Sequence, residues 1–103
     1  LKASDVVERV YRQVRQRGAS APYCPPPKSD VLHIVVAYVV DRVLGARGEL
    51  VTVSVAPLRR QFPRMHIRAP CIAAWLGLQD CVFAHRQGKV ILYLSCVREK
   101  LGL

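Results

Sequence analysis

The chain has 103 residues, enough for one domain with a single buried core, and 51% of them are hydrophobic, which excludes a largely disordered protein. Lys and Arg number 16 against 7 Asp and Glu, which gives a net charge of +9 at pH 7. Most of the basic residues are Arg, whose planar guanidinium binds phosphate and stacks on bases. The charge favours a polyanionic partner, although a merely solvated basic surface would have the same composition.

Targeting and membrane segments are not predicted. The longest apolar run, Val31 to Val40, is interrupted by His33 and is shorter than the roughly 18 residues of a membrane span. The first five residues lack the apolar stretch of a signal peptide. Because the chain begins with Leu1 rather than Met, we expect a fragment of a longer protein.

The four cysteines, Cys24, Cys71, Cys81 and Cys96, match no disulfide-dense secreted scaffold. Three lie in apolar surroundings, where free Cys behaves as a small hydrophobe. We therefore expect reduced thiols and an intracellular protein, in the nucleus, the cytoplasm or an organelle reached through a signal outside this segment. Zinc held by Cys71, Cys81, His85 and Cys96 is disfavoured because no CxxC pair exists, and no metal or cofactor is predicted.

We expect a single domain over residues 1–103, with an accessory helix within 1–18 and a Pro-rich connector over 19–29. Ser4 can cap a helix from Asp5 to Arg17, with Gly18 as its C-cap. The apolar residues of this helix share one arc of the helical wheel: Val7, Val10, Tyr11 and Val14. The opposite, cationic face could meet phosphate or could simply be solvated. The connector contains three consecutive prolines, which favour an extended segment.

Residues 30–96 form the predicted core. The Val-rich stretch Asp30–Leu44 is predicted to be a nearly buried helix, because Asp30, His33, Ala37 and Asp41 fall on one stripe at helical spacing and the residues between them are apolar. The other predicted elements are, in chain order, a strand over Glu49–Val55, helices over Pro57–Phe62 and Cys71–Gln79, and a hairpin of strands Cys81–Arg86 and Lys89–Ser95. Gln87-Gly88 suits the tight turn of this hairpin, and Val97–Leu103 is expected to be a short tail, with a last helical turn as an option.

Alternation predicts two faces for the hairpin, one of which must cover the helices. One face carries Phe83, Ile91 and Tyr93. The other carries Val82, Ala84, Val90, Leu92 and Leu94.

The order helix, strand, helix, helix, hairpin is that of a winged helix-turn-helix domain, here of the α+β class with an extra N-terminal helix. Within that superfamily the layout is similar to the LOTUS (OST-HTH) domains of RNA-associated proteins. The resembling features are Gly48 before a strand, Leu58 and Phe62 in a short helix, Trp75-Leu76 in the next helix, and Gly88 in the hairpin.

The resemblance implies a non-enzymatic module that binds RNA or DNA. In such modules the second helix of the helix-turn-helix, here Cys71–Gln79, enters a groove of the nucleic acid, and the wing touches its backbone. Carried over by position, the nucleic-acid-binding residues are Arg59, Arg60, Arg64, Arg68, His85, Arg86 and Lys89. The second helix offers almost no hydrogen-bonding side chains, so we expect binding driven by the backbone or by shape rather than by base edges.

A protein-interaction module within a larger assembly, or a homo-oligomer, is the alternative. Ala73, Ala74 and Gly77 are small enough for another helix to approach closely, although we expect them to pack against the first helix of this domain. An enzyme is not predicted, because the sequence shows no nucleophile with its base, no phosphate loop and no paired carboxylates.

Overall fold

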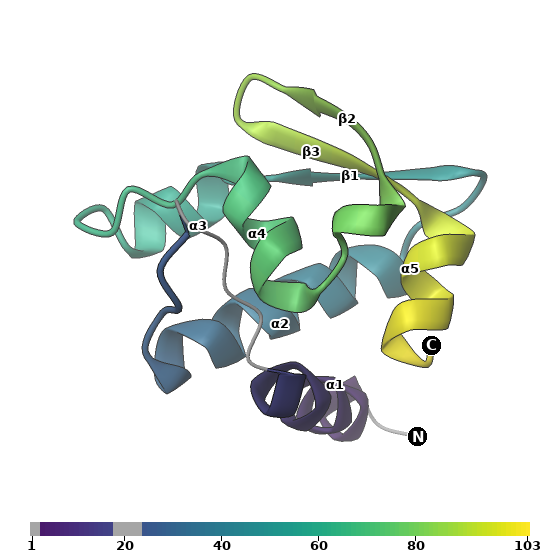
Figure 1. Cartoon of the computed structure of the whole chain (residues 1–103), viewed down its shortest axis with the longest axis horizontal. Coiled ribbons are helices and arrows are strands. Elements are labelled where there is room, and N and C mark those ends of the chain that lie inside the picture. The colour runs from purple at the N-terminus through teal and green to yellow at the C-terminus, as the bar shows by residue number, and fades with distance from the viewer. Residues whose placement is uncertain (1–2, 18–23) are drawn as a thin grey trace.

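The computed structural model describes residues 3–17 and 24–103. The predicted α+β class is confirmed: this part of the chain forms five α-helices and a three-stranded antiparallel sheet (Figure 1). The elements in chain order are α1 (Ala3–Arg17), α2 (Ser29–Leu44), β1 (Leu50–Ser54), α3 (Ala56–Gln61), α4 (Ala69–Leu76), the 3-10 helix η1 (Gln79–Cys81), β2 (Val82–Arg86), β3 (Lys89–Tyr93) and α5 (Leu94–Leu101). The predicted C-cap Gly18 and connector residues 19–23 lie outside the described residues.

Helix α2 is the buried helix that the polar stripe predicted. Val35, Val36, Val39 and Val43 are fully buried, and Asp41 on the stripe is exposed. The helix propensity of Val is at most about 0.7 kcal/mol worse than that of Ala. Burying an aliphatic side chain contributes about 1.5–3 kcal/mol, so burial outweighs the poor propensity of the valines.

The sheet has the order β1–β3–β2, which leaves β1 at an edge. Two side chains of α2 cover that edge. The Tyr38 hydroxyl donates to the Ser54 carbonyl at 2.8 Å, and the Arg42 guanidinium donates to the Thr52 carbonyl at 3.1 and 3.3 Å. These side chains occupy backbone acceptors that would otherwise be open to another strand.

The predicted hairpin is confirmed, with Gly88 at a φ of +68° in its turn. Val90 and Leu92 are fully buried, and they make the face that covers the helices. On the other face Phe83 and Tyr93 are 50% and 45% exposed, and their rings meet edge to face with centroids 5.5 Å apart.

Strand β2 contains a bulge at Phe83 that the sequence did not reveal. Val82 pairs with Leu92, but the next pair along β3 is Ile91 with Ala84, so Phe83 is an inserted residue.

The insertion changes which side chains of β2 face the helices. His85 lies opposite the buried Val90 and therefore faces the helices, whereas Ala84 lies opposite Ile91 on the other face. The prediction that Ala84 shares a face with Val90 was wrong, because strict alternation makes no allowance for a bulge.

The ends of two further elements differ from the prediction. Helix α4 ends at Leu76 rather than Gln79, because Gly77 takes the left-handed conformation, with φ +68°, that ends many helices. The chain also turns from strand to helix at Leu94, where a strand to Ser95 and a short tail were expected. The tail is instead helix α5, whose buried residues have helical spacing: Leu94, Val97 and Leu101.

Helix α1 packs on α2 through the predicted apolar arc, with Val6 added to it. Val6, Val10 and Val14 belong to the same core cluster as the rest of the domain. Two of its arginines reach α5, where Arg9 donates to the Gly102 carbonyl at 2.7 Å and Arg17 to the Lys100 carbonyl at 3.5 Å.

All four cysteines form disulfides, so the expectation of reduced thiols was wrong. Cys24 pairs with Cys71, and Cys81 pairs with Cys96. That expectation was based on the residues next to each Cys in the sequence, whereas the formation of a disulfide depends on which segments lie together in the fold. The connector lies on the first turn of α4, and η1 lies on α5.

The disulfides also bear on the expected intracellular location. That expectation was based on reduced thiols, whereas disulfides persist mainly in oxidising compartments. The cysteines therefore no longer support an intracellular location.

Among the described residues, no helix combines the length and the apolar character needed to cross a membrane. The two disulfides also leave Cys71, Cys81, His85 and Cys96 without a common cluster. No group of three or more potential metal ligands occurs in the part of the chain that the structure describes.

The two disulfides should differ in their contribution to stability. Cys24 and Cys71 are 47 residues apart, and Cys81 and Cys96 are 15 apart. In the loop-entropy model the first bond stabilises the fold by about 4 kcal/mol and the second by about 3 kcal/mol. Urea denaturation without reductant should therefore show a larger decrease in the free energy of unfolding for C24A/C71A than for C81A/C96A. The opposite order would contradict this expectation.

Trp75 is 5% exposed, and its indole N–H donates to the Pro25 carbonyl at 3.2 Å. Trp75→Ala should lower the free energy of unfolding by about 3–5 kcal/mol through the cavity that it leaves. Trp75→Phe, which keeps most of the apolar contact and loses the hydrogen bond, should cost clearly less. A Trp75→Ala protein as stable as the wild type by urea denaturation would show that the side chain is not part of the core.

Candidate nucleic-acid interface

The net positive charge of the chain is concentrated in one part of the sequence, where acids are scarce. Residues 50–98 contain seven basic residues and a single acid, Asp80. That acid is already paired, because its Oδ2 lies 3.5 Å from Lys100 Nζ. The other six acids lie outside this stretch, on or beside α1, α2 and α5. The half of the chain that forms α3, α4 and the hairpin therefore carries most of the uncompensated charge.

Helix α3 and the loop after it carry four of the predicted binding residues. Arg59, Arg60, Arg64 and Arg68 are all exposed. Arg59 is held in place, because its Nε donates to the Ile67 carbonyl at 2.8 Å. This bond joins α3 to the residue before Arg68, so the structure places these two arginines on adjoining segments.

The hairpin tip is fixed against the start of α3. The Val55 amide donates to the Gly88 carbonyl at 2.9 Å, and a Cβ on Gly88 would lie 3.8 Å from the Val55 side chain. Arg86 and Lys89 pair across the two strands beside this turn, and both are exposed. The basic tip is thus positioned by backbone contacts rather than by an ion pair.

None of the predicted cations is sequestered by an acid. Among the residues that the structure describes, no ion pair or side-chain hydrogen bond involves the following: Arg60, Arg64, Arg68, Arg86 and Lys89. Arg59 donates to a carbonyl, which leaves its charge uncompensated. The positive charge of all six residues is therefore available to an anion.

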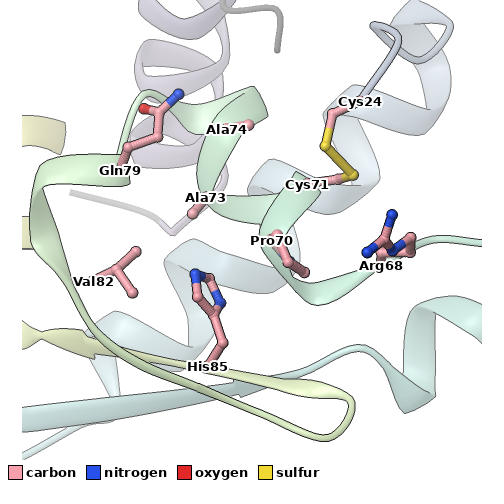
Figure 2. A pocket seen from close by; sticks show the side chains of 9 residues that line it. All are labelled: Cys24, Arg68, Pro70, Cys71, Ala73, Ala74, Gln79, Val82 and His85. Carbon is pink, nitrogen blue, oxygen red and sulfur yellow. A yellow bond between two sulfur atoms is a disulfide. The ribbon is translucent and has the colours of Figure 1, made fainter. Parts of the chain in front are cut away.

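A pocket of about 340 Å³ lies between α4 and β2 (Figure 2). Arg68 and His85 are the predicted binding residues that line it, and the ring of His85 points from β2 toward α4. The inward turn of His85 follows from the bulge at Phe83. Arg60, Arg64, Arg86 and Lys89 do not line this pocket; they extend the charged surface beyond it.

Sequence reasoning missed the other walls of this pocket. Ala73 and Ala74 of α4, Val82 and Gln79 line it together with the Cys24–Cys71 disulfide. Gln79 was predicted only to be the last residue of the helix Cys71–Gln79, and the disulfide was not expected at all. No local sequence signal marks a bulge or a pairing between distant cysteines, so these residues could not have been assigned to one site.

The small residues of α4 are not an open docking face. Ala73 and Ala74 are 2% and 3% exposed, and α4 packs mainly on α2, β2 and β3. The expectation that they pack within the domain is confirmed, although the sheet and α2, rather than α1, are the main neighbours. Gly77 lies near α1, since a Cβ there would be 3.9 Å from an Arg17 nitrogen.

Neighbouring arginines of α3 should differ in their effect on the fold. Arg59→Ala removes the bond to the Ile67 carbonyl and should lower the free energy of unfolding by about 1–2 kcal/mol. Arg60→Ala, with no such bond, should change it by less than about 0.5 kcal/mol. Equal stabilities of the two variants in urea denaturation would show that the Arg59 bond does not contribute.

No protein-family model, curated protein or solved structure matches the chain. The assignment of a function therefore depends on the geometry and charge of the site itself.

Proposed function

We propose that the chain is a non-enzymatic, winged-helix module that binds RNA or DNA through phosphate contacts, with the β2–β3 hairpin as its wing. The observation that carries this proposal is the set of exposed cations on α3, on the loop before α4 and on the hairpin tip, which no acid among the described residues neutralises. Each phosphate that such a cation binds releases a condensed counterion, which favours association with nucleic acid.

The arrangement of the elements supports the same proposal. A helix, a strand, two short helices and a hairpin follow one another, and the first strand pairs with the last in the order β1–β3–β2. In winged helices this layout places the hairpin beside the second helix, where both can reach one nucleic acid. A LOTUS-like domain remains the more specific form of this proposal.

The burial of α4 determines what kind of contact is available. Of its eight described residues only Pro70 is exposed. Side chains that are buried in the core cannot reach base edges in a groove. Binding therefore depends on the residues that flank α4 and on the wing, and it is driven by the phosphate backbone and by shape.

An intracellular location, in the nucleus, the cytoplasm or an organelle, is part of this proposal because nucleic acid is found there. In a reducing compartment the two cysteine pairs would be thiols. Binding should therefore be measured on both the oxidised and the reduced protein.

A protein-interaction module is the second candidate, for a reason different from the one that the sequence suggested. The outer face of the sheet exposes Leu50, Phe83 and Tyr93, which are 38%, 50% and 45% exposed. Leu50 pairs with Tyr93, so the three side chains are neighbours. Sizing at several concentrations tests for self-association through this face, and a monomer at all concentrations that binds nucleic acid would favour the first candidate.

Charge reversal at the wing tip should weaken binding without unfolding the protein. Arg86→Glu with Lys89→Glu should reduce the affinity for a labelled RNA or DNA strand at least about tenfold at ~50 mM salt, and lower the salt slope by roughly two units. Fluorescence anisotropy measures both quantities.

Arg12→Glu with Arg15→Glu is the matched control. These residues are exposed on α1, at the opposite end of the molecule from the hairpin (Figure 1), and the double variant changes the net charge equally. Equal losses in the two double variants would show that only the overall charge matters, and would remove the wing from the site.

A further inference from the structure

We propose that the pocket between α4 and β2 binds one unpaired nucleobase, so that the module selects single-stranded over duplex nucleic acid. This inference rests on the proposed function, and it adds the form of the nucleic acid and the site at which a base is held.

The size of the pocket suits one planar ring system. Its volume of about 340 Å³ is at the lower end of the range of roughly 300–1,000 Å³ for small-molecule sites. The space exists because the residues of α4 on this side, Ala73 and Ala74, have the smallest side chains that a helix tolerates well. Pro70, Val82 and the Cys24–Cys71 disulfide add further apolar surface. Such walls favour a flat, weakly polar group over a charged one.

The bulge gives the pocket its aromatic side chain. If β2 continued from Val82 in regular register, His85 would lie opposite Lys89 and face outward, as Ile91 does. With the inserted Phe83, His85 turns toward α4, and its ring lies in the space between β2 and α4 (Figure 2). Aromatic rings, that of His among them, are the usual stacking partners of unpaired bases.

Two polar side chains complete the site. Gln79, just before β2, has an amide that can both donate to and accept from a base edge. Arg68, just before α4, offers a guanidinium plane for stacking or a fork for the adjoining phosphate. Arg68, Gln79 and His85, which lie at different places around the pocket, are exposed, so the pocket is open to solvent (Figure 2).

The charge around the pocket favours a nucleotide over an apolar side chain of a protein. None of the described residues that line it is an acid. Arg86 follows His85 on β2, and Arg59 is fixed to Ile67 beside Arg68, so cations lie beyond both of these lining residues. A base in the pocket would therefore have its flanking phosphates near positive charge, as single-strand binding sites usually arrange.

The test compares two strands of equal charge by fluorescence anisotropy. One is an eight-nucleotide oligouridine RNA, and the other is an abasic ribose-phosphate strand of the same length. The wild type should bind the oligouridine at least about fivefold more tightly than the abasic strand, since one stacked base contributes at least about 1 kcal/mol. His85→Ala and Ala74→Leu should each abolish this preference, so that each variant binds the oligouridine and the abasic strand with equal affinity.

Phe83→Ala is the matched control, because it removes an exposed aromatic ring from the same strand on the opposite face. It should keep the preference for bases. His85 is exposed, so His85→Ala should fold even if the larger side chain of Ala74→Leu proves too large for its site. Far-ultraviolet circular dichroism and urea denaturation verify the fold of each variant.

Several outcomes would overturn the inference. If the wild type binds both strands and a duplex equally well, the pocket has no role while the proposed function stands. If Phe83→Ala loses the preference and His85→Ala keeps it, the base is held on the outer face of the sheet. If no strand or duplex binds at ~50 mM salt, the proposed function falls as well. If an acidic peptide with an aromatic residue binds instead of the strands, and His85→Ala abolishes this binding, the pocket binds a protein side chain and not a base.

Discussion

The attachment of the connector to α4 is the constraint on which the rest of this structure depends. The Cys24–Cys71 disulfide joins the connector to the first turn of α4, and the indole N–H of Trp75 donates to the Pro25 carbonyl at 3.2 Å. Together with α2 and the sheet, the connector encloses α4 so that Pro70 is its one exposed residue among the eight described. A helix held in this way contributes to the core and to a pocket wall, and it is not free to lie in a groove with its side chains on base edges.

This burial explains why the surface charge lies where it does. The core takes the apolar side chains of α4, so the cations are found on the segments around it: α3, the loop from Arg64 to Arg68, and the hairpin tip. Hydrogen bonds to two backbone carbonyls fix these segments, because the Arg59 side chain donates to Ile67 and the Val55 amide donates to Gly88. Because these segments are already fixed in the free protein, fewer side chains and loops become ordered on binding, and the loss of conformational entropy is smaller. A surface of this kind can bind a phosphate backbone with little reorganisation.

The sequence predicted those features of the fold that depend on local periodicity. The stripe of Asp30, His33, Ala37 and Asp41 identified α2 despite its valines, and Gln87-Gly88 identified the hairpin turn. The features that the sequence did not predict are the two disulfides and the packing of α5 on the sheet. Both depend on contacts between segments that are distant in the sequence. Part of the helical spacing of α5 was visible in Leu94, Val97 and Leu101, but the expectation of a strand to Ser95 hid it.

The candidate site could be predicted only as a set of charges. All seven predicted residues are exposed, which their residue types already favoured. The sequence could not show that Arg68 and His85 line one pocket, because their meeting depends on an inserted residue in β2 and on where α4 begins.

The pocket and the cations would contribute to recognition in different ways. Phosphate contacts are available on single strands and duplexes alike, so the cations alone do not distinguish the two. A base can enter the pocket from a duplex only after it is unpaired and unstacked, which costs a few kcal/mol. One stacking contact returns about 1–3 kcal/mol, so a duplex gains little or nothing by placing a base there. The bases of a single strand are already unpaired, so most of this free energy is not needed and the stacking energy adds to the affinity. The discrimination that we propose therefore follows from an apolar space for one base, without any side chain that repels a duplex.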